Sequence, residues 1–228
     1  MKIFRDRVDG GRELGLRLKG LGLTGDLIVL GLPRGGVPVA CEVAAALDAP
    51  VDVLVVRKLG APFNPELGVG AIAFGGVTVY NEQLLADLDL DEDMLEPIRE
   101  REQAELERRE RAYRGGKPLP DLQDKTVIIV DDGIATGATM HAAVLAARKL
   151  RPRQIIVAVP TSAADSVARL QKVADRVVAI ATPEPYFGVG AWYSEFPQLT
   201  DQEVLDWLTR AAESKAGAVA ADTAQQSA

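Results

Sequence analysis

The sequence predicts an α/β protein built on a doubly wound parallel sheet of about five strands. Short runs of β-branched and aliphatic residues recur along the chain, and they are continuous rather than alternating, as in strands that are buried on both faces. Helix-like segments separate most of these runs, an alternation typical of parallel sheets with crossover connections. Small, glycine-containing segments directly follow two of the runs, at strand ends where open α/β sheets bind their ligands. The predicted strands are 27–30, 53–56, 127–130, 155–159 and 177–180.

The composition is that of an ordinary globular domain. Of the 228 residues, 47% are hydrophobic and 26% are charged, which allows one sizeable core. We expect a single domain over residues 1–213 and a disordered tail over residues 214–228. The formal charge of −7 disfavours a nucleic-acid partner, and a single cysteine and a single histidine exclude a Cys/His metal cluster. Because no apolar run approaches about 18 residues, we expect no membrane span and a cytoplasmic location.

Local patterns predict the remaining elements. Residues 9–21 suggest a weak amphipathic helix, since glycines interrupt its apolar positions. Gly75 and Gly76 lie between short apolar runs and predict a β-hairpin over residues 71–80. Residues 81–114 mix acidic and basic side chains at helical spacings, which predicts an exposed helical insertion. Further helices are expected at 37–47, 138–150, 163–173 and 201–212.

The most informative stretch is 127–139, in which a buried strand ends in Asp131 and Asp132. An Asp–Asp pair alone would more often be a turn with a helix cap, in about two cases of three. Here, residues 136–139 add two hydroxyls and exposed backbone N–H groups at a helix start, which is a nest for one phosphate. A phosphorylated sugar would occupy both features at once.

This stretch resembles the ribose-phosphate signature of the type I phosphoribosyltransferases. The resemblance implies that Asp131 and Asp132 are catalytic residues that hold the ribose 2′ and 3′ hydroxyls of phosphoribosyl pyrophosphate. It also implies Mg²⁺-dependent transfer of the phosphoribosyl group to a nitrogenous base in a homodimer. We expect the Mg²⁺ to be carried largely by the substrate, with no dedicated metal site in the protein. The residues implied to wrap the 5-phosphate are Ala135, Thr136, Gly137, Ala138 and Thr139.

A second loop, formed by Arg34, Gly35 and Gly36, follows the first predicted strand and resembles the pyrophosphate loop of the same family. Taken alone, it is as well explained by a tight turn with a solvated arginine. The resemblance implies that Arg34 is catalytic and meets the departing pyrophosphate together with the N–H groups of both glycines. It also implies a cis peptide bond between Pro33 and Arg34.

Arg57 and Lys58 come at the end of the predicted strand 53–56. Two basic residues there can be simply a solvated strand terminus. At the carboxyl end of a sheet strand, however, they would also face pyrophosphate, and we predict that role for them.

Residues 182–197 follow the last predicted strand and gather aromatic side chains among glycines and prolines. Core packing explains such a cluster about half the time. In the resembling family this region is the hood that covers the nucleobase. The resemblance therefore implies that Phe187, Trp192 or Tyr193 stacks on the acceptor.

Ala135 bears on the choice of acceptor. In the resembling 6-oxopurine enzymes, an aspartate at this position exchanges a proton with the purine, whereas adenine enzymes have alanine. Because a methyl group transfers no proton, we expect poor turnover of hypoxanthine and guanine. The hood has no pattern that matches one substrate, so the acceptor itself stays open.

Two other functions fit the same motif. A phosphoribosyl pyrophosphate synthetase has a similar motif on the same fold, but it needs an ATP site and normally two such domains, for which one doubly wound sheet leaves little room. A non-catalytic regulator would sense phosphoribosyl pyrophosphate through this fold and bind a protein partner, for which the charged segment 81–114 is a candidate surface. Turnover with a base acceptor would distinguish the enzyme from the regulator.

Overall fold

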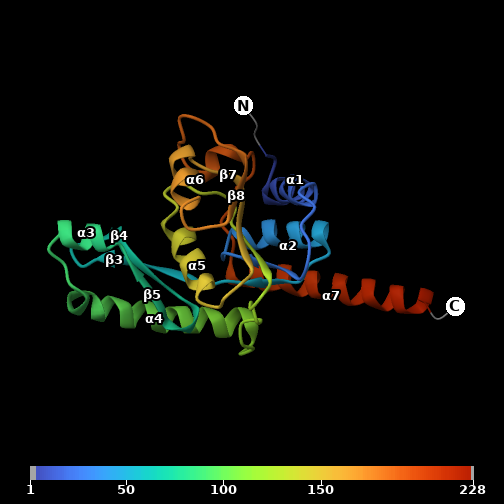
Figure 1. The fold of residues 1–228 in the computed structure, drawn as a ribbon, viewed down its shortest axis with the longest axis horizontal. Helices are drawn as coiled ribbons and strands as arrows, with labels where there is room; N and C mark the ends of the chain where they lie inside the picture. Colours follow the sequence, from blue (N-terminus) through green and yellow to red (C-terminus); the bar gives the residue numbers. More distant parts are fainter. Residues whose placement is uncertain (1–3, 227–228) are drawn as a thin grey trace.

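The computed structural model describes residues 4–226 and is organised around a five-stranded sheet in the order β2-β1-β6-β7-β8 (Figure 1). Every pairing between neighbouring strands of this sheet is parallel, which confirms the predicted fold class. Its carboxyl edge therefore collects the loops that follow all five strands. The strands are β1 (Leu27–Gly31), β2 (Val51–Val53), β6 (Thr126–Val130), β7 (Gln154–Thr161) and β8 (Arg176–Ala181).

The continuous apolar runs are explained by helices on both faces of the sheet. Along β6, Val127 and Ile129 pack with α5 (Ala138–Arg148) and α6 (Ala164–Leu170) on one face. Ile128 and Val130 pack with α1 (Arg7–Lys19) and α2 (Gly36–Leu47) on the other. Since successive side chains of a strand point to opposite faces, both sets must be apolar.

The glycines of α1 allow it to pack closely on α2. A Cβ at Gly11 would lie 2.9 Å from the Cβ of Glu42, and a Cβ at Gly15 would lie 2.7 Å from the Cβ of Ala46. The helix that looks weak by propensity is thus held by tertiary packing, and Asp6 caps its start by accepting a hydrogen bond from the Asp9 N–H at 2.8 Å. This packing places the first residue of α1, Arg7, near the carboxyl edge of the sheet.

An arm between β2 and β6 projects to one side of the sheet (Figure 1). It contains an antiparallel sheet of β3 (Val56–Ala61), β4 (Asn64–Ala73) and β5 (Val77–Tyr80), with a 3-10 turn at Phe74–Gly76. The predicted hairpin around Gly75 and Gly76 is confirmed, and both glycines have positive φ angles of 69° and 72°. The predicted helical insertion is present as two helices, α3 (Glu82–Asp87) and α4 (Glu92–Arg114).

The strand predicted at 53–56 is wrong in its extent. The sheet strand β2 ends at Val53, and the arm strand β3 begins at Val56. Leu54 and Val55 are buried in the connection, so the apolar run reflects burial of a link as well as of a strand. As a result, Arg57 and Lys58 lie within β3 and not at the carboxyl edge of the main sheet.

The C-terminal helix α7 (Asp201–Gln226) is longer than predicted and extends away from the body (Figure 1). The sequence predicts a helix only to residue 212 and disorder from residue 214, whereas α7 continues to Gln226. The sequence predicts disorder because residues 214–228 are small and polar. The extension also contains many alanines, and alanine has the highest helix propensity, which favours a helix there. Residues 227–228 of the predicted tail lie outside the described residues. Within the described part of the chain, every helix is too short or too polar to cross a bilayer.

Candidate active site at the carboxyl edge of the sheet

Two loops predicted to bind different parts of one substrate lie against each other. The loop after β1 is anchored by a hydrogen bond from the Leu32 N–H to the Val130 carbonyl at 2.8 Å. A Cβ at Gly36 would lie 2.7 Å from the Val130 carbonyl oxygen, and a Cβ at Gly35 would overlap Oδ2 of Asp132. The two glycines thus bring the predicted pyrophosphate loop onto the two carboxylates. The peptide bond between Pro33 and Arg34 is cis, as the resemblance implies.

Both carboxylates of the pair occupy an environment that disfavours their charge. The Asp131 carboxylate accepts a hydrogen bond from the Asp132 N–H at 2.8 Å. Burial raises the pKa of Asp131 well above its ordinary value, and the neighbouring charge of Asp132 raises it further. Burial also raises the pKa of Asp132, while a hydrogen bond from Arg7 acts in the opposite direction.

Arg7 is a site residue that the sequence does not reveal. Its Nε donates to Oδ2 of Asp132 at 2.8 Å, and its NH1 donates to the Pro197 carbonyl at 2.8 Å. The guanidinium carbon lies 3.8 Å from the centre of the Phe196 ring. Arg7 is only 8% exposed, which is rare for an arginine without a partner. Because Asp132 is far away in the sequence, no local pattern signals this pair.

The predicted phosphate loop is open to solvent and begins a helix. Ala135, Thr136, Ala138 and Thr139 are exposed, and Gly137 caps α5 with a positive φ of 76°. The first N–H groups of α5 therefore remain available to an anion, together with the positive end of the helix dipole.

Two side chains of α6 fix this loop by hydrogen bonds to its backbone carbonyls. The hydroxyl of Ser166 donates to the Ala135 carbonyl at 2.6 Å, and NH2 of Arg169 donates to the Thr136 carbonyl at 3.2 Å. The same Arg169 nitrogen also contacts the Ser166 hydroxyl at 2.7 Å. These two positioning residues also escape sequence reasoning, since they contact the loop through tertiary structure alone.

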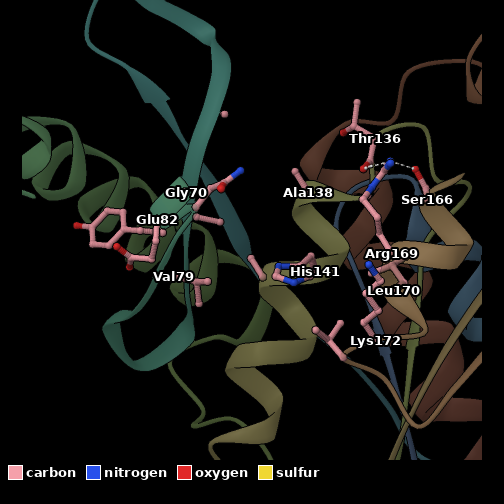
Figure 2. Close-up of a pocket in the computed structure, with 17 residues that line it drawn as sticks. Gly70, Val79, Glu82, Thr136, Ala138, His141, Ser166, Arg169, Leu170 and Lys172 are labelled. Atoms are coloured by element: carbon pink, nitrogen blue, oxygen red, sulfur yellow. Dashed lines mark hydrogen bonds between the residues drawn. The ribbon is translucent and has the colours of Figure 1, made fainter. Parts of the chain in front are cut away.

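A cavity of about 500 Å³ lies beside the phosphate loop, between the arm and the helices α5 and α6. In Figure 2, Gly70, Val79 and Glu82 lie on one side, and Arg169 lies on the opposite side. Ala138 and the lone histidine, His141, lie between them on α5. Burial lowers the pKa of His141, so its neutral form is favoured at neutral pH. Residues 136–138 belong to both the cavity and the phosphate loop.

The basic residues predicted to face pyrophosphate are separated by the fold. Arg34 is exposed in the loop after β1, and its NH1 lies 4.0 Å from Oδ1 of Asp201 at the start of α7. Arg57 is paired inside the arm, where its Nε donates to Glu102 at 2.8 Å. Lys58 lies beside it in β3. Arg57 and Lys58 therefore do not lie at the end of a strand of the main sheet, as the sequence suggested. Their pyrophosphate role stays a prediction, but the strand-end argument no longer supports it.

The aromatic residues of the predicted hood differ in their exposure. Trp192 is 1% exposed and stacks on Tyr186, with ring centres 5.9 Å apart. Tyr193 is 6% exposed, and its hydroxyl donates to the Asp132 carbonyl. Phe187 is 79% exposed. Burial leaves little ring surface of Trp192 and Tyr193 for stacking on an acceptor, whereas the Phe187 ring is exposed, and the stacking role of these residues stays a prediction.

The hood is also packed directly on the strand end of β6. A Cβ at Gly133 would lie 2.5 Å from the side chain of Val189, which belongs to the hood turn at Val189–Trp192. The glycine that follows the two aspartates therefore makes room for the hood. Aromatic burial here serves to fix the hood beside the carboxylates.

Comparisons with known proteins agree with this geometry. Residues 21–194 match the family model of the phosphoribosyl transferase domain. Two curated proteins of Mycobacterium tuberculosis, from strains CDC 1551 and H37Rv, are each named "Putative phosphoribosyl transferase" and are 47% identical over 224 residues. The match covers 98% of this chain, which spans about half the length of those relatives.

A solved structure is also similar. The protein TT1426 from Thermus thermophilus superposes with a TM-score of 0.80 at 42% identity, and the match covers 91% of this chain and 98% of that one. The family match includes both glycine loops, the two aspartates and most of the hood. The chain therefore belongs to the type I phosphoribosyltransferase family.

Proposed function

We propose that the protein transfers the phosphoribosyl group of phosphoribosyl pyrophosphate to a nitrogenous acceptor and releases pyrophosphate. The observation that carries this proposal is the direct contact of Gly35 and Gly36 with the Asp131–Asp132 pair. A ribose held at the carboxylates would place its C1 substituent next to the 34–36 loop and its 5-phosphate next to the 135–139 loop. One substrate thereby accounts for three neighbouring features.

The chemistry follows from where charge appears. The bond between ribose C1 and the pyrophosphate oxygen breaks, and pyrophosphate leaves with the bonding electron pair. A bond forms between C1 and the acceptor nitrogen, and the proton on that nitrogen is released. Arg34 and the Gly35 N–H stabilise the charge on the leaving group, while the carboxylates and the phosphate loop hold the sugar. The Gly36 N–H donates to the Leu32 carbonyl at 3.0 Å and holds the turn of the 34–36 loop.

Mg²⁺ would supply further neutralisation of the pyrophosphate charge when bound. Asp131 and Asp132 offer carboxylate oxygens, the ligand type that Mg²⁺ prefers, but their Oδ atoms already contact Arg7 and the Asp132 N–H. Among the described residues, no three acidic, histidine or cysteine side chains gather as a metal-binding group. These donors suit an ion that arrives with the substrate and retains several water ligands.

The location and assembly of the protein are part of the same proposal. A single buried cysteine, Cys41, suits a reducing cytoplasm. Burial raises the pKa of the Cys41 thiol to about 12, so the unreactive thiol form dominates.

We further propose a homodimer, which size-exclusion chromatography with light scattering would test.

Catalysis is tested by measuring pyrophosphate release against a panel of bases, beside calorimetric binding of phosphoribosyl pyrophosphate with Mg²⁺. Turnover with one acceptor supports the enzyme, and Arg34→Ala should then lower turnover more than nucleoside monophosphate binding. Binding without turnover on any acceptor would favour the regulator. Absence of binding would overturn the proposal, and AMP formation from ATP and ribose 5-phosphate would indicate a synthetase.

The acceptor preference rests on Ala135. Its side chain is exposed at the phosphate loop, and no carboxylate there is available to exchange a proton with a purine. A positioned acid or base typically contributes 10²–10⁴-fold, so we expect hypoxanthine and guanine to show a kcat/KM lower than the best acceptor by roughly that factor. The measurement compares hypoxanthine, guanine, adenine, uracil and orotate at saturating phosphoribosyl pyrophosphate.

The matched variant is Ala135→Asp, which should fold normally because position 135 is exposed. It should raise 6-oxopurine turnover relative to adenine if the base binds beside this position. A wild-type enzyme that prefers hypoxanthine or guanine would contradict the prediction from Ala135.

A further inference from the structure

Arg7 joins three parts of the molecule that are distant in sequence. It begins α1, contacts the Asp132 carboxylate that follows β6, and donates to the Pro197 carbonyl at the end of the hood. The Phe196 ring lies against its guanidinium. Each of these partners restricts the guanidinium in a different direction, so its position is fixed more firmly than that of a surface arginine.

Arg7 contacts the same oxygen of Asp132 that the 34–36 loop approaches at Gly35. Oδ2 of Asp132 is the atom that Arg7 touches, and it is also the atom nearest to the missing Cβ of Gly35. The carboxylate is therefore held between an arginine and the backbone of the predicted pyrophosphate loop. The same oxygen thus meets both the arginine and the loop backbone, which fixes the orientation of the carboxylate.

We propose that Arg7 is a positioning residue that holds the Asp132 carboxylate as the acceptor for a ribose hydroxyl of phosphoribosyl pyrophosphate. This inference rests on the proposed function, because it assigns a role in that same site. Arg7 would act through Asp132 and need not touch the substrate.

The charges around Asp132 indicate why a cation is needed there. Asp131 faces it from the same strand end, and Tyr193 contacts its carbonyl from the hood. Burial raises the pKa of Tyr186, a further hood residue, and the nearby charge of Asp132 raises that pKa further. Neither tyrosine supplies positive charge, so Arg7 compensates the charge of Asp132, which burial disfavours. Without it, the raised pKa of Asp132 would rise further.

If Arg7 blocked the site instead of positioning Asp132, its removal would change the binding affinity in the opposite direction. If the Arg7–Asp132 pair blocked the ribose site, removing Arg7 would release the carboxylate and strengthen binding. If Arg7 positions the carboxylate, removing it must weaken binding. Measurement of affinity therefore separates the two roles directly.

The experiment is calorimetric binding of phosphoribosyl pyrophosphate with Mg²⁺ from pH 5 to pH 8 to the full chain and its variants. For Arg7→Gln we expect a loss of about tenfold to a hundredfold at pH 7, the equivalent of one charge-assisted hydrogen bond. The pH at which binding is half lost should also move upward, because Asp132 is protonated at a higher pH. A residue that only supports the fold would not move this midpoint.

Two further variants make the test specific. Arg12→Gln removes an exposed arginine of the same helix, which pairs with Glu42 at 3.0 Å, and should bind as the wild type does. Arg7→Lys keeps the charge but loses the arginine geometry, so we expect an intermediate affinity and an unchanged pH midpoint. Should Arg7→Gln fail to fold by circular dichroism, the Lys variant decides, and wild-type affinity in it would overturn the proposal.

The outcomes distinguish this inference from the proposed function. If the wild type does not bind phosphoribosyl pyrophosphate, the proposed function fails. If the wild type binds and a folded Arg7→Gln variant binds equally well or more tightly at each pH, only the role of Arg7 is overturned. A double variant Arg7→Gln/Asp132→Asn should lose less than the sum of the single losses, because the two residues act as one unit.

Discussion

The two loops at the sheet edge are held in place by opposite means. The loop after β1 is fixed by the absence of side chains, since Gly35 and Gly36 let its backbone lie against Asp131 and Asp132. The loop after β6 is fixed by added side chains, since Ser166 and Arg169 reach it from α6. An added methyl group in the closely packed loop after β1 should therefore cause a large loss of stability. A loop fixed by individual hydrogen bonds should lose stability in small steps.

The strongest test of this contrast is Gly35→Ala. Its Cβ would overlap Oδ2 of Asp132, so either the carboxylate or the loop must move. We expect a loss of about 1–3 kcal/mol in the free energy of unfolding and a loss of phosphoribosyl pyrophosphate binding of at least about tenfold. Denaturant unfolding and calorimetry measure the two effects.

The control for this variant is Gly20→Ala at the end of α1. A Cβ there would lie 3.5 Å from the nearest atom, the Arg17 carbonyl oxygen, which is ordinary contact. It should leave both quantities near their wild-type values. Equal effects from the two alanines would show that the 34–36 loop is not closely packed in solution.

Asp131→Asn should separate stability from binding. The pKa of Asp131 in the folded state lies above its unfolded value of about 3.9, so ionisation costs the folded protein free energy. The stability tied to its protonated form is complete below about pH 4 and is lost as the pH rises through the folded-state pKa. Asparagine does not ionise and can still accept the Asp132 N–H. The variant should therefore gain stability relative to the wild type between about pH 4 and pH 7.

Binding by the same variant should change in the opposite direction. Loss of the charged acceptor should weaken phosphoribosyl pyrophosphate binding by about 1.5–3 kcal/mol. Thermal unfolding across pH and calorimetry at pH 7 provide the measurements. A variant that is destabilised at neutral pH would show that the Asp131 carboxyl makes a contact that asparagine does not replace.

The smallest effect is expected from Arg169→Ala, which removes one support of the phosphate loop. The side chain is about half exposed, and it donates to the Thr136 carbonyl at 3.2 Å. We expect phosphoribosyl pyrophosphate affinity to fall by about threefold to tenfold, with little change in unfolding.

The control for lost positive charge is Arg176→Ala. It removes an exposed arginine at the amino end of β8, away from the carboxyl edge of the sheet that holds the site. Its binding should match the wild type. A larger loss for Arg176→Ala than for Arg169→Ala would mean that general charge, and not support of the loop, governs the affinity.

The same contrast explains how much could be predicted from sequence. Gly35, Gly36 and the run 127–130 are local patterns, because close backbone approach and burial on both faces leave their mark on neighbouring residues. Arg7 and Ser166 act on partners distant in sequence, so a single chain gives no signal for them. These are the positioning residues that sequence reasoning missed.

Two limits of the sequence predictions have a related cause. The run 53–56 looked like one strand because Leu54 and Val55 are buried, although they lie in a connection. Trp192 and Phe187 are both aromatic hood residues, and composition alone does not show that one is buried and the other exposed. Residue type records apolar character, while the assignment to a strand, a link or a binding surface depends on tertiary contacts.

The cavity between the arm and α5 has a thermodynamic consequence. Residues 136–138 line it and also form the phosphate loop, so one backbone segment faces two spaces. Any molecule that fills the cavity and shifts this segment must change the free energy of phosphate binding. By reciprocity, a bound phosphate must change the affinity for that molecule by the same factor. Such a molecule would link the arm energetically to the sheet edge through residues 136–138.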